Sequence, residues 1–140
     1  MTQKITEKKI QEKILEYRVL EERMNQLFQQ RALFMSKLQE LEITKETLKE
    51  ISKVGEKKIL VAIGSMTYAN AKLLGSDKVL VEIGANVALE KSIPEAEKIL
   101  EKRKQNLESA LKRLGEEIER TTQLMQSLQT ELQKLGVGKA

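Results

Sequence analysis

The strongest constraint on the fold is a hydrophobic repeat in the last third of the chain. Between residues 93 and 135, mostly apolar residues recur at alternating steps of three and four, which is the spacing of a coiled-coil seam. With a polar interruption at Lys104, the seam consists of Leu100, Leu107, Leu111, Leu114, Ile118, Thr121, Met125, Leu128, Leu132 and Leu135. A helix with such a stripe depends on a partner that covers it. The sequence therefore predicts a second long helix.

A helical repeat over residues 4–53 supplies this partner. Its two seam positions hold Ile10, Tyr17, Met24 and Leu38, and Leu20, Leu27, Phe34, Leu41 and Leu48. The stripe is widened by Ile14, Phe28 and Met35. Three basic residues, Lys13, Arg31 and Lys45, interrupt the seam, and we expect each to pair with a glutamate on the facing helix.

Cap signals mark the ends of both helices. The sequence Ser92-Ile93-Pro94-Glu95 is a capping box with proline in the first turn, and Gly55 and Gly136 stand where helices end. Because the helices are similar in length and the segment between them turns the chain back, antiparallel pairing is predicted. The expected facing pairs are Lys45 with about Ile99, Met24 with about Thr121, and Ile10 with about Lys134.

The central region, residues 57–91, has the composition of β-structure. Runs rich in Val, Ile and Leu cover residues 57–64, 67–74, 78–84 and 86–91, and glycine-containing turns separate them. Two β-hairpins in series are the simplest arrangement. We therefore expect an α+β fold in which residues 1–140 form a single subunit, with helices at 4–53 and 93–135 around two central hairpins.

The predicted strands are apolar on both faces, and this feature favours assembly. A helix pair covers at most one face of a hairpin, and isolated hairpins are marginally stable in water. We therefore predict oligomerisation through Ile59, Val61, Ile63, Val79, Val81, Ile83, Val87 and Leu89. The alternative is that all four strands close into one self-contained sheet against the helix ends.

Composition excludes several classes of function. The chain has no cysteine and no histidine, and no glycine-rich phosphate loop, so we expect neither an enzyme nor a metal or cofactor site. Its 25 basic and 21 acidic residues are interspersed, which argues against nucleic-acid binding. The chain has no long apolar run, and its first ten residues, MTQKITEKKI, have no apolar signal-peptide core. We therefore expect neither membrane insertion nor secretion, and we expect a cytoplasmic location.

Three central segments carry a resemblance to a known family. They are Ile59-Leu-Val-Ala-Ile-Gly64, Asp77-Lys-Val-Leu-Val-Glu-Ile-Gly-Ala85 and Val87-Ala-Leu-Glu-Lys91, the last followed by the capped helix. In this order, between two matched helices, they resemble the alpha-type subunit of archaeal prefoldin, and four central strands favour the alpha type over the beta type. The chain departs from the family pattern at Ala62, Met66 and Asn86, where proline, glycine and glycine are common.

The resemblance implies a hetero-hexamer with beta-type subunits, in which the β-hairpins form an oligomeric β-barrel and coiled-coil arms extend from it. It also implies a holdase, an ATP-independent chaperone that binds non-native protein clients with the arm ends and passes them to a group II chaperonin. Two other functions stay open. One is a structural coiled-coil scaffold or filament subunit without clients, and the other is an adaptor that grips one folded partner.

Apolar residues near both termini are the candidate client-binding set. They are Ile5, Ile10, Ile14, Leu15, Leu124, Met125, Leu128, Leu132, Leu135 and Val137. Such flexible aliphatic and methionine side chains pack against many partners. Most of them also close the last turns of the coiled coil, whereas Leu15, Leu124 and Val137 lie outside the seam. These three are therefore the better individual candidates.

Overall fold

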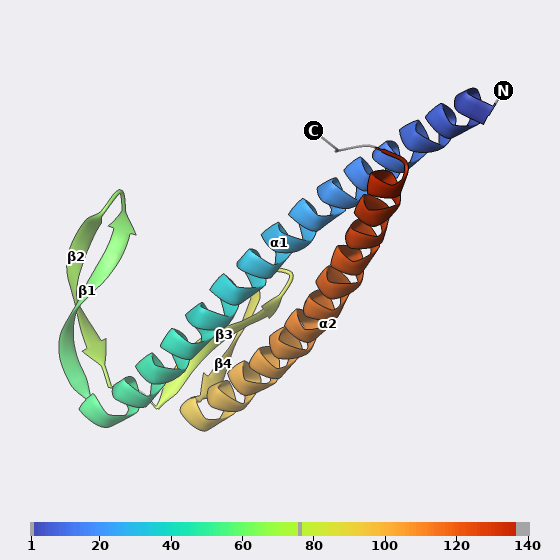
Figure 1. Cartoon of the computed structure of the whole chain (residues 1–140). Coiled ribbons are helices and arrows are strands. Elements are labelled where there is room, and N and C mark those ends of the chain that lie inside the picture. Colours follow the sequence, from blue (N-terminus) through green and yellow to red (C-terminus); the bar gives the residue numbers. More distant parts are fainter. Residues whose placement is uncertain (1, 76, 137–140) are drawn as a thin grey trace. The chain divides into compact units, whose positions relative to one another are not determined.

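The computed structural model describes residues 2–75 and 77–136, with the side chains of Thr2, Gln3 and Ile5 left out (Figure 1). The elements follow in the order α1 (Thr2–Val54), β1 (Glu56–Gly64), β2 (Thr67–Leu74), β3 (Lys78–Gly84), β4 (Val87–Ser92) and α2 (Ile93–Lys134). The predicted α+β class, two long helices around two antiparallel hairpins, is confirmed.

The four strands form two separate two-stranded sheets, β1–β2 and β3–β4. The alternative of one self-contained four-stranded sheet is therefore wrong. Each hairpin turns through two residues with positive φ, Ser65 and Met66 in the first and Ala85 and Asn86 in the second. This turn conformation matches the right-handed twist of the paired strands. Because it requires positive φ, glycine and asparagine are favoured at these positions. Met66 adopts it with a side chain that is 92% exposed.

Two compact units make up the chain. The central unit comprises residues 37–106, and the terminal unit comprises the described residues of 1–36 and 107–140. The core of the central unit joins the last turns of α1, the β3–β4 hairpin and the first turns of α2. Its buried members are Leu48, Val81, Ile93, Ala96 and Leu100.

Polar contacts fix the β3–β4 hairpin to α2. The amide of Ile93 donates to the carbonyl of Asp77 at 3.0 Å, and the amide of Glu95 donates to the Ser92 hydroxyl at 3.3 Å. The second bond belongs to the predicted capping box, in which the cap side chain satisfies a backbone amide of the first turn. The guanidinium of Arg103 donates to the carbonyl of Glu82. This hairpin is therefore held by both apolar and polar contacts.

The β1–β2 hairpin is exposed along its whole first strand. Its register pairs Ile59 with Ala71 and Val61 with Ala69. The hairpin is entered and left through two glycines that touch: a Cβ at Gly75 would lie 2.8 Å from the carbonyl carbon of Gly55. Both glycines also have positive φ, 62° at Gly55 and 65° at Gly75. A side chain at Gly75 would therefore be strained by its backbone and by its neighbour.

Two ion pairs join the helices within the central unit. Lys45 Nζ lies 2.5 Å from Glu101 Oε2, as predicted for a polar seam residue, and Lys104 Nζ lies 2.7 Å from Glu42 Oε1. Glu101 lies two positions from about Ile99, the residue predicted to face Lys45, and this offset is within the reach of a lysine side chain. Hydrogen bonds from the two lysines lower the pKa of both glutamates below its ordinary value.

The contact of the two glycines generates the first prediction. Gly75→Ala is expected to strain the base of the β1–β2 hairpin by about 1–3 kcal/mol, because the new methyl group meets the Gly55 backbone. Amide hydrogen exchange should become faster in β1 and β2 while α2 keeps its protection. Gly115→Ala is the matched control, since nothing lies within 4 Å of a Cβ at this helical glycine, and it should stabilise α2 by about 0.8–1 kcal/mol. Unchanged exchange in Gly75→Ala would contradict the steric argument.

The second prediction concerns acid. Because folding lowers the pKa of Glu42 and Glu101, their ion pairs stabilise the folded chain above the ordinary carboxyl value of 4.5. This contribution is lost as the pH falls from 4.5 through the lowered pKa values. Thermal unfolding followed by circular dichroism should give a midpoint that drops over this range.

The double variant Glu42→Gln and Glu101→Gln should show a smaller drop, because it has no such carboxylate to protonate. Glu119→Gln, at an exposed position of α2, should keep the original pH dependence. If the double variant lost as much stability in acid as the unmodified chain, the two ion pairs would not be the source.

Candidate functional site

The seam of the terminal unit is packed as the sequence predicts, but two residues of its predicted wider stripe, Phe28 and Met35, are 43% and 57% exposed. Leu27 of α1 is 1% exposed, and Met24, Leu114 and Thr121 are also buried. Thr121 is accommodated because its hydroxyl donates to the carbonyl of Glu117 at 2.8 Å. This packed seam forms the base on which the neighbouring surface is built.

Charged residues along the seam align the two helices. Lys13 pairs with Glu131, as predicted for a polar seam residue, and Arg23 pairs with Glu117. Arg31 was expected to pair with a glutamate on the facing helix. Instead its guanidinium lies 5.1 Å from the ring centroid of Phe28 on its own helix. A cation over an aromatic face is a favourable contact at an exposed position.

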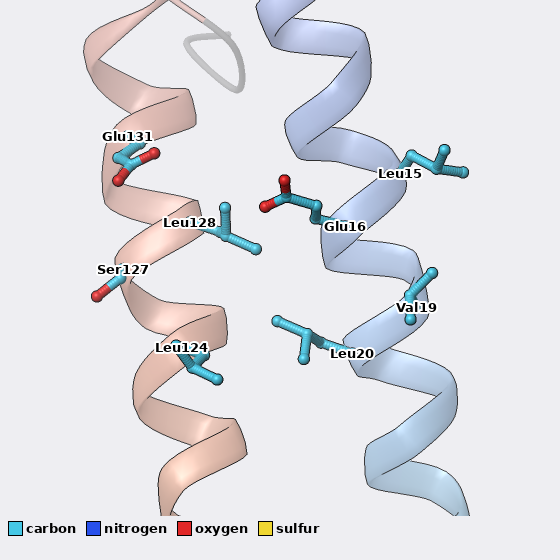
Figure 2. Close-up of a pocket in the computed structure, with 8 residues that line it drawn as sticks. All are labelled: Leu15, Glu16, Val19, Leu20, Leu124, Ser127, Leu128 and Glu131. Atoms are coloured by element: carbon cyan, nitrogen blue, oxygen red, sulfur yellow. The ribbon is translucent and has the colours of Figure 1, made fainter.

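A groove of about 500 Å³ lies beside this seam, and Figure 2 shows the residues that line it. We call it the apolar groove. It is lined by Leu15, Glu16, Val19 and Leu20 of α1 and by Leu124, Ser127, Leu128 and Glu131 of α2. Leu20 and Leu128 point toward one another between the helices and form its floor (Figure 2). Five of the eight side chains are aliphatic.

The walls of the apolar groove are unusually exposed for aliphatic residues. Leu15 is 64% exposed, Val19 is 60% exposed and Leu124 is 56% exposed. Leu15 and Val19 stand four residues apart, so they share one face of α1, and Leu124 directly precedes the seam residue Met125. The helix period therefore places all three outside the contact between the helices. Clustered apolar exposure of this kind is typical of a binding surface.

The charged groups of the groove lining are acidic. Glu16 and Glu131 belong to its lining, which includes no lysine or arginine. The ammonium of Lys13, outside the lining, pairs with Glu131. The pKa of Lys13 is raised, chiefly because its ammonium donates a hydrogen bond to that carboxylate. The groove thus combines an apolar floor with an acidic rim.

The structure distributes the predicted client-binding residues over two environments. Leu15, Leu124 and Leu128 line the apolar groove, with Leu128 buried in its floor. Half-buried positions in the seam or on its widened stripe hold Ile10, Ile14, Met125, Leu132 and Leu135. The side chain of Ile5 and the residue Val137 lie outside the described part of the chain. Sequence reasoning missed Val19, although its spacing of four from Leu15 signals a shared face.

Over the residues that the structure describes, no three His, Cys, Asp or Glu side chains gather to hold a metal ion. In the same part of the chain, neither long helix has an apolar stretch sufficient to span a lipid bilayer. The polar side chains of the groove lining are the carboxylates of Glu16 and Glu131 and the hydroxyl of Ser127. The groove is therefore suited to capturing an apolar segment.

Comparisons with known proteins agree on one family. The family model described as "Prefoldin subunit" matches residues 20–138. The prefoldin subunit alpha of Nitrosopumilus maritimus is 33% identical over 114 residues, which cover 74% of this chain and 79% of that protein. The prefoldin subunit alpha of Methanopyrus kandleri is 35% identical over 79 residues, which cover 56% of this chain and half of that protein.

A solved structure is also similar. The chain matches the cryo-EM structure of a filamentous PFD from Methanocaldococcus jannaschii with a TM-score of 0.70 and 25% identity. The match covers 86% of this chain and 98% of that one.

The contrast between the floor and the walls of the groove generates the third prediction. Leu128→Ala should destabilise the chain by about 2–4 kcal/mol, because it removes buried contacts at the seam, whereas Leu15→Ala should change stability by about 0.5 kcal/mol or less. Urea unfolding at equal protein concentration measures both. A large loss in Leu15→Ala would mean that Leu15 packs within the fold and is not available to a partner.

Proposed function

The chain belongs to the prefoldin family, and from this premise we propose that it is a subunit of an ATP-independent chaperone that holds non-native proteins. The family comprises chaperones rather than enzymes. The observation that carries the proposal is the apolar groove, in which Leu15, Val19 and Leu124 are exposed beside a packed seam. Family membership likewise supports a cytoplasmic location and residues 1–140 acting as one subunit.

The proposed holding mechanism is weak binding at several sites. Full burial of one aliphatic side chain is worth about 1.5–3 kcal/mol, before the cost of ordering a flexible client. Three exposed residues per groove therefore give a modest affinity, and several grooves in one assembly multiply it. Residues at half-buried positions, such as Ile10 and Leu132, would add to binding where the helix ends separate.

The proposed assembly uses the hairpins. β1 is exposed along its length, and its Ile59, Val61 and Ile63 offer apolar surface to hairpins of other subunits. Ile83, Val87 and Leu89 of the second hairpin are also exposed. Val81, by contrast, belongs to the core of the central unit, and Val79 is partly buried against that core. Partners of this kind would be beta-type prefoldin subunits in a hetero-hexamer with a shared β-barrel. Delivery of clients to a group II chaperonin completes the proposed role.

The fourth prediction tests the groove as the client site. The triple variant Leu15→Ser, Val19→Ser and Leu124→Ser, assembled with a beta-type partner, should suppress the aggregation of a diluted, denatured model protein at least about tenfold less efficiently. Light scattering without ATP measures this effect. The reason is that serine removes the apolar surface available to the client.

The matched control is the triple variant Leu33→Ser, Met35→Ser and Ile43→Ser, which removes three similarly exposed apolar residues of α1 outside the groove. It should retain suppression. Sedimentation should give the same oligomer for both variants. Equal suppression by the groove variant and the unmodified chain would reject the groove as the client site, and no suppression by the intact assembly would reject the holdase function.

A second candidate function is a filament subunit. It is favoured by the likeness to the filamentous PFD from M. jannaschii and by the exposed β1–β2 hairpin. Subunits that pair head to tail grow without limit, whereas a closed ring stops at one size. Electron micrographs of the purified chain at rising concentration separate the two, since filaments lengthen and a hexamer does not.

A further inference from the structure

A second hollow adjoins the apolar groove. It has a volume of about 470 Å³ and is lined by Gln123, Gln126, Ser127, Thr130 and Glu131, all on α2. We call it the polar shelf. The apolar groove and the polar shelf share Ser127 and Glu131. A bound segment can therefore contact aliphatic side chains on one edge and amide side chains on the other.

The polar shelf is suited to an extended backbone. The hydroxyl of Thr130 is already bonded to the carbonyl of Gln126 at 3.0 Å, whereas the side chains of Gln123 and Gln126 are exposed. Each glutamine amide both donates and accepts hydrogen bonds. Extended, unpaired backbone offers N–H and C=O groups to match them, whereas a helix has already bonded most of its own. The shelf therefore favours a segment without secondary structure.

The charge on the rim of the apolar groove is a second feature, after the polar shelf, that bears on which segments bind. The chain has a net charge of +4, yet the groove lining contains two glutamates and no lysine or arginine. Lys13 pairs with Glu131 and also interacts with Glu16 and Glu12, so one ammonium faces three carboxylates and the rim keeps a net negative charge. The carboxylate of Glu16 points toward α2 (Figure 2). Glu12, one turn earlier on the same face of α1, adds to this negative charge.

We propose that the terminal unit selects extended segments in which a lysine or arginine stands beside aliphatic or aromatic residues. This inference rests on the proposed function and specifies its client chemistry. The apolar residues enter the groove, the basic side chain meets Glu16, and the backbone lies on the polar shelf. An acidic segment of equal hydrophobicity is disfavoured, because its carboxylates meet Glu16 next to a poorly hydrated apolar surface.

The fifth prediction uses two labelled synthetic peptides of the same leucine, phenylalanine, glycine and serine content, one with two lysines and the other with two glutamates. Fluorescence anisotropy with the full-length assembly should show the lysine peptide binding about 3–10-fold more tightly at about 0.05 M salt. The difference should shrink at about 1 M salt, where screening acts over about 3 Å. Glu16→Gln should narrow the difference, and Glu119→Gln, on α2 outside the groove lining, should leave it unchanged.

A further variant tests the shelf. Gln123→Ala with Gln126→Ala should weaken both peptides by a similar factor, because backbone contacts do not depend on peptide charge. Alanine keeps the helix intact, and circular dichroism checks this point.

The outcomes separate this inference from the proposed function. Equal binding of the two peptides, together with aggregation suppression that is lost in the groove triple variant, overturns the charge preference and leaves the holdase function standing. A preference for lysine that survives in Glu16→Gln also overturns it, since another surface would then be responsible. Failure of both peptides to bind overturns it as well, and if the assembly also fails to suppress aggregation, the proposed function falls with it.

Discussion

The contact between the apolar stripes of α1 and α2 is the interaction on which the other features depend. A helix with an apolar seam gains most of its stability from the partner that covers it. In the terminal unit Leu27 and Thr121 are buried in this contact, and in the central unit Leu48 and Leu100 are. Ion pairs such as Lys13 with Glu131 hold the helices in register. The position of every flanking side chain follows from that register.

The same register explains why an exposed apolar groove exists beside a packed seam. Seam residues occupy one face of each helix. The next residue in the sequence lies about 100° further around the helix axis, on the flank of the seam. Leu15, Val19 and Leu124 occupy such flanks, where each stays more than half exposed. The apolar groove therefore needs no loop and no cavity in a globular core. It follows from placing aliphatic residues one or two positions away from the seam.

The sequence was sufficient to predict the features that depend on periodicity and local caps. Every predicted seam position of α2 is buried or half-buried, and the Ser92 cap bonds to Glu95 as its spacing indicates. Other features depend on contacts that no period encodes. The guanidinium of Arg31 lies over the ring of Phe28 rather than beside a glutamate of the facing helix. Gly75 lies close to Gly55, although the β1–β2 hairpin separates them in the sequence. The exposure of Leu15 was foreseeable, but its convergence with Leu124 required the register in three dimensions.

The contact of Gly55 with Gly75 makes the β1–β2 hairpin a modular insert. Its two ends meet within the reach of about one peptide unit, which spans 3.8 Å between Cα atoms. A chain joined directly across these glycines would lose residues 56–74 while α1 keeps its connection to the segment before β3. Excision of this kind would leave a one-hairpin subunit that retains the core residues Leu48 and Val81. The shortened chain would thus keep both long helices of this subunit.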